Sequence, residues 1–210
     1  MTHSANVYIH PAALVETDAI GPGSRVWAHA HIMSGVTIGP DCNICDSVFI
    51  ESGVTLGRGV TVKPHVAMGE GLTVEDGVFI GPHVVFTNDL RPRSPRLPLT
   101  HARYAKKSQW LLPTRVRHGA TLGAGVVVSC GITIGEWSFA AAGAVLLQDV
   151  PPFALMLGNP ARPVGYACAC GATLNMNEGK ATCPDCPRTY TLIDRRLTPD
   201  HPITLWEETP

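Results

Sequence analysis

The sequence predicts an all-β protein whose main part is a parallel β-helix, a stack of coils built from very short strands. Three observations support this: an apolar residue recurs at every sixth position, a second inward residue follows four positions later, and glycine occupies the turns. A period of six is typical of coils that each bury the next. An α-helix would give a period of about 3.6, and a β-sandwich would space its strands about 8–12 residues apart.

The apolar series runs unbroken through the first part of the chain. At 45% hydrophobic residues, such a run of fourteen would arise by chance with a probability on the order of 10⁻⁵. Its members are Tyr8, Leu14, Ile20, Val26, Ile32, Ile38, Ile44, Ile50, Leu56, Val62, Met68, Val74, Ile80 and Phe86. The series resumes at Val116, Leu122, Val128, Ile134, Ala140 and Leu146. We expect all of these side chains to point into the coil.

Glycine lies three residues after the apolar position at ten places, among them Gly35 and Gly53. Glycine adopts positive φ without steric cost, so it suits a tight corner between two short strands. The chain therefore predicts strands joined by corners rather than by long loops.

Composition excludes several classes of protein. A formal net charge of −1 lacks the basic excess of a nucleic-acid-binding protein. The most apolar late stretch, 140–157, is interrupted by polar residues and prolines, so we expect no membrane span. The first residues lack the pattern of a secretory signal. An odd number of cysteines, seven, with four of them clustered, favours a reducing, cytoplasmic location over a disulfide framework.

The repeat lapses between Phe86 and Val116, where the chain carries several prolines and basic residues. A surface insertion with no function is one interpretation, since loops tolerate insertions. Long loops in compact domains are usually functional or disordered, and the flanking coils are regular. We therefore expect a loop at about 89–114 that helps to build a site.

The segments Ile38-Gly39-Pro40-Asp41-Cys42-Asn43 and Ile80-Gly81-Pro82-His83-Val84-Val85 resemble the hexapeptide repeats of left-handed β-helix acyltransferases. The resemblance covers roughly residues 1–165. It implies a left-handed coil of three hexads, and a homotrimer with active sites between adjacent subunits.

The motif Val85-Phe86-Thr87-Asn88, followed by Pro92-Arg93-Ser94, resembles sugar-nucleotide N-acetyltransferases, as does the stretch 107–124. The resemblance implies transfer of acetyl from acetyl-CoA to the 3-amino group of a nucleotide-linked sugar. One branch acts on UDP-2-acetamido-3-amino-2,3-dideoxyglucuronate and another on dTDP-3-amino-3,6-dideoxyhexoses, and both stay open. Asn88 takes the family's role beside the reacting amine. Asp89 is expected to assist it, and Arg91 and Arg93 are candidate substrate-binding residues.

A coil of three hexads, about 18 residues, places residue 70 beneath residue 88 and residue 65 beneath residue 83. Glu70 would then lie under Asn88, where a carboxylate and a carboxamide could hold an ammonium group or sugar hydroxyls. Glu70 is thus the third candidate catalytic residue. His65 and His83 are candidate substrate-binding residues, with the alternative that they are structural neighbours only.

The coil ends in a proline-rich stretch and the motif Gly158-Asn159-Pro160-Ala161-Arg162. This could simply cap the solenoid. In hexapeptide acyltransferases, however, a similar motif lies near the nucleotide end of CoA, and backbone amides of a late coil approach the thioester. The resemblance therefore implies cofactor-binding roles for Gly143, Ala144, Asn159, Pro160, Ala161 and Arg162.

From Tyr166 the composition changes, and Cys168 and Cys170 are followed by the CxxC pair Cys183 and Cys186. The pattern resembles a zinc ribbon, in which four thiolates bind one structural Zn²⁺. Such a module is too small to fold on an apolar core alone. We expect it at 166–196, followed by a tail at 197–210; four unligated thiols are the alternative.

Two other functions compete with acetyl transfer. A metal-dependent hydratase resembling γ-class carbonic anhydrases shares the coils but needs two histidines five residues apart, and the nine histidines include no such pair. A non-catalytic scaffold or binding module is the other. The loop with Asn88 favours an enzyme.

Overall fold

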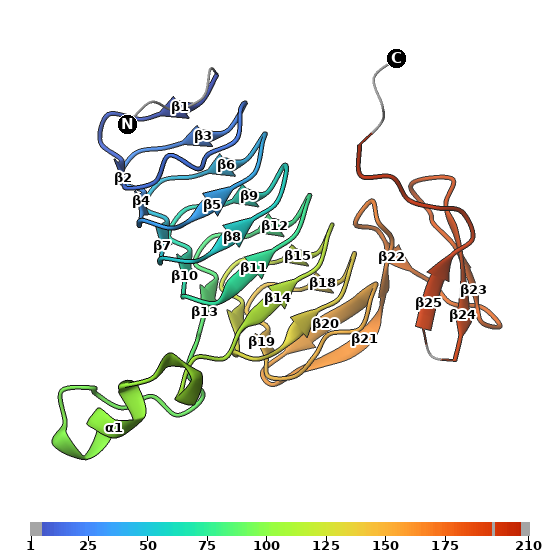
Figure 1. Cartoon of the computed structure of the whole chain (residues 1–210). Helices are drawn as coiled ribbons and strands as arrows, with labels where there is room; N and C mark the ends of the chain where they lie inside the picture. Colours follow the sequence, from blue (N-terminus) through green and yellow to red (C-terminus); the bar gives the residue numbers. More distant parts are fainter. Residues whose placement is uncertain (1–5, 195, 207–210) are drawn as a thin grey trace.

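The computed structural model describes residues 6–194 and 196–206. Its larger part is a parallel β-solenoid in which successive strands pass to three faces in turn (Figure 1). Strands on each face pair with the strand one coil earlier and one coil later, all in parallel. The predicted parallel β-helix is confirmed.

Face A comprises β1 (Tyr8–Ile9), β3 (Arg25–Val26), β6 (Asn43–Ile44), β9 (Thr61–Val62), β12 (Phe79–Ile80), β15 (Thr121–Leu122) and β18 (Phe139–Ala140), prolonged by β20 (Ala154–Gly158), β21 (Ala161–Ala167) and β22 (Thr173–Leu174). Face B comprises β2 (Leu14–Val15), β4 (His31–Ile32), β7 (Phe49–Ile50), β10 (Ala67–Met68), β13 (Val85–Phe86), β16 (Val127–Val128) and β19 (Val145–Leu146). Face C comprises β5 (Thr37–Ile38), β8 (Thr55–Leu56), β11 (Leu72–Val74), β14 (Thr114–Val116) and β17 (Thr133–Ile134).

The second residue of each two-residue strand points inward, because successive side chains of a strand alternate between its two faces. Ile32, Ile44 and Ile50 are all fully buried. Burying such a side chain contributes roughly 1.5–3 kcal/mol relative to leaving it exposed. The stacked isoleucines, valines and leucines thus form one continuous core along the solenoid axis.

The first coil departs from the predicted register. Tyr8 and Leu14 are exposed, and Ile9 and Val15 pack against the core instead. The cause is coil length: Tyr8 pairs with Arg25, 17 residues later. A one-residue slip sends a strand's side chains to its opposite face. The prediction of inward side chains for Tyr8 and Leu14 is therefore wrong, whereas it is confirmed from Ile20 onward.

The corners take left-handed backbone at every sixth residue, as the glycine pattern predicts. Gly35, Gly53 and Gly71 have φ of +75°, +80° and +87°. Residues with side chains occupy some equivalent corners, including His65 (+61°) and His83 (+59°). Asp and His are among the residues that tolerate this conformation best. The corner between faces A and B therefore presents imidazoles at His29, His65 and His83, whereas the other two corners mostly present glycine.

A loop leaves the solenoid between β13 and β14 and contains η1 (Pro98–Thr100), α1 (His101–Tyr104) and η2 (Lys107–Gln109). It projects from the stack near the end of face B (Figure 1). Across it, Val74 pairs with Val116, 42 residues later, in place of the 18 that separate Leu56 from Val74. The insertion of 24 residues (42 − 18) therefore leaves the coils in register.

The start of the loop is fastened by Asp89. Its carboxylate accepts hydrogen bonds from the Arg103 guanidinium, the Tyr104 hydroxyl (2.8 Å) and the backbone N–H of Arg91 (2.9 Å). The Asp89 side chain is only 8% exposed. The Arg103 guanidinium beside it lowers the pKa of the Asp89 carboxyl to about 2. Asp89 thus ties the beginning of the loop to α1 as a permanent anion.

Beyond the last coil, β21 turns back antiparallel on β20, and the chain enters a second small core around Phe153, Cys168 and Tyr190. A separate antiparallel sheet follows, made of β23 (Lys180–Thr182), β24 (Thr189–Ile193) and β25 (Arg196–Pro199). β25 carries this sheet into residues that the sequence assigned to a tail. The segment 200–206 then runs back to the corner between faces C and A, where the Arg58 guanidinium lies over the Trp206 ring at 4.7 Å.

Within the two described ranges, no helix combines the length and the apolar character that a membrane crossing requires.

The anchor at Asp89 predicts the behaviour of the loop. Asp89→Asn removes the charge that holds Arg103, so trypsin should cleave the loop several-fold faster at neutral pH. In the unchanged protein the folded pKa lies below the ordinary 3.8, so the anchor is complete above about pH 4 and is lost as the pH falls through about 2. Time courses of limited proteolysis measure the first effect and hydrogen exchange of the loop the second. Equal cleavage rates for the two proteins would contradict this role.

Candidate functional site

Three acidic or amide residues from three successive coils lie at the corner between faces B and C, next to the base of the loop. They are Glu51, Glu70 and Asn88. Met68 pairs with Phe86, so residue 70 lies directly beneath residue 88, as the coil arithmetic predicts. The corner thus places the Glu51 carboxylate beside the Asn88 carboxamide. The loop projects from the solenoid directly after β13 (Figure 1).

Hydrogen bonds connect the three residues. The Glu51 Oε2 atom accepts from Asn88 Nδ2 at 3.3 Å and from the Glu70 backbone N–H at 2.7 Å. The Glu70 carboxylate forms an ion pair with the Lys107 ammonium from the loop. The backbone carbonyl oxygen of Asn88 accepts a hydrogen bond from the Leu112 backbone N–H at 3.1 Å, where the loop returns to the solenoid. The site therefore draws on three successive coils of the solenoid and both ends of the loop.

Sequence reasoning missed Glu51. In the 18-residue register, Ser52 is the residue one coil below Glu70. Glu51 lies beneath Gly69 instead, and its carboxylate bonds to Glu70 and Asn88 on either side of that glycine. The usable signal is Gly69 itself, because a position without a side chain lets a residue of the coil below contact the coil above.

The other candidates of the loop lie apart from Asn88. Asp89 turns into the loop, with both carboxylate oxygens bonded to Arg103 and Tyr104. The Arg91 and Arg93 side chains are exposed on the loop surface. In the single chain they form a basic surface beside the site rather than part of it.

His65 and His83 stack on each other with ring centroids 5.0 Å apart and planes at 11°. This agrees with the prediction that residue 65 lies beneath residue 83. Both occupy the corner between faces A and B, so His65 precedes β10 and Glu70 follows it. Within one chain, the histidines and Asn88 therefore lie at opposite edges of face B.

The cofactor candidates fall in two places. Gly143, with φ of +72°, occupies the same corner as the histidines two coils further on, and Ala144 next to it is buried. Asn159 and Pro160 form the turn between β20 and β21. Ala161 and Arg162 line a cavity of about 230 Å³ at the last coil. These two places are adjacent, because Met156 of β20 pairs in parallel with Ala140 of β18, which puts the turn at Asn159 at the A–B edge of face A, one coil beyond Gly143.

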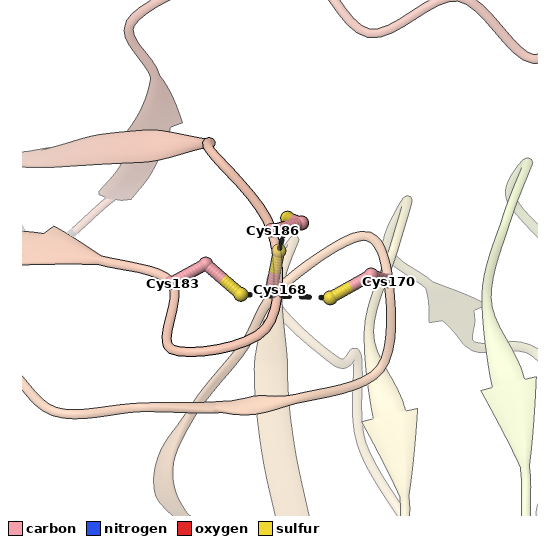
Figure 2. Close-up of side chains that lie close together, drawn as sticks. All are labelled: Cys168, Cys170, Cys183 and Cys186. Atoms are coloured by element: carbon pink, nitrogen blue, oxygen red, sulfur yellow. Dashed lines mark hydrogen bonds between the residues drawn. The ribbon is translucent and has the colours of Figure 1, made fainter.

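The four cysteines of the C-terminal module converge on one point, with all four sulfur atoms within 4.8 Å of one another. Figure 2 shows the Cys170 and Cys183 side chains pointing toward each other, with their sulfurs 3.5 Å apart. Cys168 and Cys186 are 3.6 Å apart. A tetrahedral zinc ion with Zn–S bonds of about 2.3 Å requires sulfur atoms about 3.8 Å apart. The donor set and its spacing therefore fit one Zn²⁺.

The surroundings perturb these thiols in opposite directions. Burial raises the pKa of Cys170 to about 12, whereas the backbone N–H of Arg188 lowers the pKa of Cys186 to about 6. Of these two thiols, Cys186 reaches the thiolate form more readily, and thiolate is the form that binds a metal.

Among the described residues, the cysteine cluster is the only group of three or more His, Cys, Asp or Glu side chains arranged to hold a metal. Within the residues that the structure describes, no three histidines lie close enough together to bind a metal, as a γ-carbonic-anhydrase-like hydratase would require in a single chain.

Comparison with known proteins identifies relatives among the acetyltransferases. Over 191 residues the chain is 46% identical to the dTDP-3-amino-3,6-dideoxy-alpha-D-galactopyranose 3-N-acetyltransferase of Aneurinibacillus thermoaerophilus, covering 91% of this chain and 94% of that protein. Over 52 residues it is 38% identical to the 2,3,4,5-tetrahydropyridine-2,6-dicarboxylate N-acetyltransferase of Brevibacillus brevis, covering 25% and 22% of the two chains.

Among solved structures, a hexapeptide-repeat acetyltransferase of Vibrio cholerae in complex with acetyl coenzyme A matches 69% of this chain and 70% of that one, with 26% identity and a TM-score of 0.45. No protein-family model matches the chain. The relationship therefore stands on the first relative, whose similarity extends over nearly the whole of both sequences. By that similarity, and by its solenoid of hexads, the chain belongs to the hexapeptide-repeat family of nucleotide-sugar 3-N-acetyltransferases.

Proposed function

We propose that this enzyme transfers the acetyl group of acetyl-CoA to the 3-amino group of a dTDP-linked 3-amino-3,6-dideoxyhexose. The observation that carries the proposal is the 46% identity over 91% of the chain to an enzyme named for that reaction. The dTDP branch is preferred to the UDP-glucuronate branch on the same ground. A scaffold function is disfavoured by the polar corner at Asn88, which a merely structural coil would not need.

The reaction joins the amine nitrogen to the thioester carbonyl carbon and breaks the carbon–sulfur bond. The CoA thiolate leaves and takes up the proton lost by the nitrogen. Asn88 holds the amine through its side-chain oxygen, which accepts an N–H and directs the nitrogen lone pair toward the thioester. Holding two reactants in this way can remove roughly 7–11 kcal/mol of the barrier.

Glu70 and Asp89 support this reaction in different ways. Glu70 binds Lys107 and so ties the loop to the coil. A second proposed role of its carboxylate is to accept hydrogen bonds from sugar hydroxyls. Asp89, with a pKa of about 2, is a poor general base near neutral pH because it holds a proton too weakly. It assists by holding the loop that carries Arg91 and Arg93, whose guanidinium groups suit the diphosphate of a nucleotide sugar.

We also propose a homotrimer that packs on face B. The outward residues of this face are apolar apart from His31: Leu14, Phe49, Ala67, Val85, Val127 and Val145. Those of face C are mostly threonine: Thr37, Thr55, Thr73 and Thr133. Phe49 and Val85 are 37% and 39% exposed in the single chain. Packing this face around a threefold axis would bury them.

Such a ring explains why the candidates lie on two corners. Three solenoids with face B toward the axis bring the A–B corner of one chain to the B–C corner of the next. His65, His83 and Gly143 of one chain would then face Asn88 and Glu70 of its neighbour. Acetyl-CoA would lie in the groove between them, its thioester near Gly143 and Ala144 and its nucleotide near Asn159, Pro160, Ala161 and Arg162.

We propose that Cys168, Cys170, Cys183 and Cys186 hold a structural Zn²⁺. Four sulfur donors fill a tetrahedral shell, which leaves no position for a substrate. When bound, the ion would supply folding free energy to a module with a small core. A thiolate metal site, with the cysteines of the described residues unpaired by disulfides, also supports our proposal of a reducing, cytoplasmic location.

The substrate proposal predicts a clear order of activity. With acetyl-CoA, kcat/KM should be highest for dTDP-3-amino-3,6-dideoxygalactose, and much lower for UDP-2-acetamido-3-amino-2,3-dideoxyglucuronate. Asn88→Ala should lower kcat/KM about 100-fold, since misplacing a reacting group by about 1 Å costs this much. Asn43→Ala, which removes a carboxamide bonded to Trp27 on face A, is the matched control and should remain active. Near-normal turnover by Asn88→Ala would refute its role.

The metal proposal predicts one zinc per chain in freshly reduced protein, measured by elemental analysis. Cys183→Ser should lose the zinc and lower the melting temperature, whereas Cys45→Ser, on the solenoid, should keep it. Reduced protein without zinc would rule the site out.

The trimer proposal is checked by sedimentation. Val85→Glu would bury a charge in the contact between chains, so it should give monomers that have lost acetyl transfer. Thr37→Glu, which adds the same charge to face C, should remain a trimer. A trimeric Val85→Glu protein would exclude face B as the contact.

A further inference from the structure

The Glu51 carboxylate, at the B–C corner, contacts the Asn88 side chain. Its Oε2 atom lies 3.3 Å from Asn88 Nδ2 and 2.7 Å from the Glu70 backbone nitrogen. The second bond is to main chain of the next coil, so it fixes the carboxylate independently of any substrate. The Glu51 carboxylate is therefore already held in place when it accepts the hydrogen bond from Asn88 Nδ2.

The chemistry of the two groups decides which way the Asn88 amide faces. An ionised carboxylate only accepts hydrogen bonds, so the NH₂ group of Asn88 must face Glu51. The Asn88 Oδ1 atom is then turned the other way. The terminal torsion of asparagine has a broad energy profile, so without such a partner the amide rotates easily.

Gly69 supplies the space that this arrangement needs. A Cβ atom at residue 69 would lie 3.0 Å from Asn88 Nδ2 and 3.2 Å from its Cγ. Both distances are shorter than an ordinary van der Waals contact of about 3.5–4.0 Å. The Asn88 amide therefore occupies space that a side chain at residue 69 would fill, with its Nδ2 atom bonded to Glu51.

We infer that Glu51 is a positioning residue, which orients the Asn88 amide so that its oxygen, and not its NH₂ group, meets the substrate amine. The inference rests on the proposed function, because it concerns the acceptor that Asn88 offers to that amine. Glu51 itself need not touch the substrate. An Asn88 turned the other way would present two donors to the amine and would compete with its N–H groups for the same space.

The test compares purified full-length enzymes with acetyl-CoA and the dTDP-linked amino sugar. Glu51→Ala should lower kcat/KM for the amino sugar on the order of 10- to 100-fold, the usual effect of losing a hydrogen bond to a charged group. Glu51→Gln should stay within about threefold of the unchanged enzyme, because its amide oxygen can accept both bonds. Gly69→Ala should also lower activity, by displacing Asn88 while leaving Glu51 in place.

The double variant Glu51→Ala/Asn88→Ala separates positioning from a general structural role. If Glu51 acts through Asn88, the double variant should be no slower than Asn88→Ala alone, because residues that act as a unit are not additive. Effects that multiply would overturn the inference. A loss in Glu51→Gln as large as in Glu51→Ala would also overturn it, since the charge itself would then be required.

Glu16 is a matched control. It follows β2 as Glu51 follows β7, and its carboxylate accepts from the backbone N–H of Ser34 on the next coil at 3.3 Å. Glu16→Ala should lose a similar bond with no effect on kcat. An active Asn88→Ala enzyme would reject the proposed site as a whole. A slow Asn88→Ala enzyme with a Glu51→Ala enzyme within twofold of normal would reject only the role of Glu51.

Discussion

The structure depends on a backbone constraint: over 23–83 and again over 119–143, every sixth residue adopts positive φ, so that two-residue strands meet at three corners. This fixes the length of a coil and therefore which residues stack. The isoleucine and valine core follows from it, because the same inward position recurs on each coil. So does the site, because Glu70 and Asn88 lie together only through the 18-residue register. A corner that lost its conformation would shift every side chain beyond it.

Sequence alone predicted the fold because the period of six is local and is repeated many times. It also predicted that His65 stacks under His83 and Glu70 under Asn88, since both follow from coil length. It failed at Tyr8 and Leu14, where the coil is one residue shorter. The apolar pattern does not reveal this, because the residues that follow them, Ile9 and Val15, are apolar too.

The candidate site was predicted less completely than the coils, for two physical reasons. The Glu51 carboxylate contacts Asn88, which does not lie directly above it in the stack, through the space left by Gly69. The 18-residue spacing identifies only residues that lie directly above one another, so it does not predict this contact. The partners of Asp89 lie in an insertion without a period, so no arithmetic could place Arg103 beside it. Stacked positions can thus be predicted from spacing, whereas contacts made by a loop depend on how that loop folds.

The 24-residue insertion leaves the solenoid in register, and this bears on how such enzymes diversify. The loop enters and leaves at one corner, and the coils on either side pair as if it were absent. Its sequence is therefore under little pressure from the core. An insertion of different length or sequence at this point would leave the strand register, and with it the position of Glu51 on the coil, unchanged.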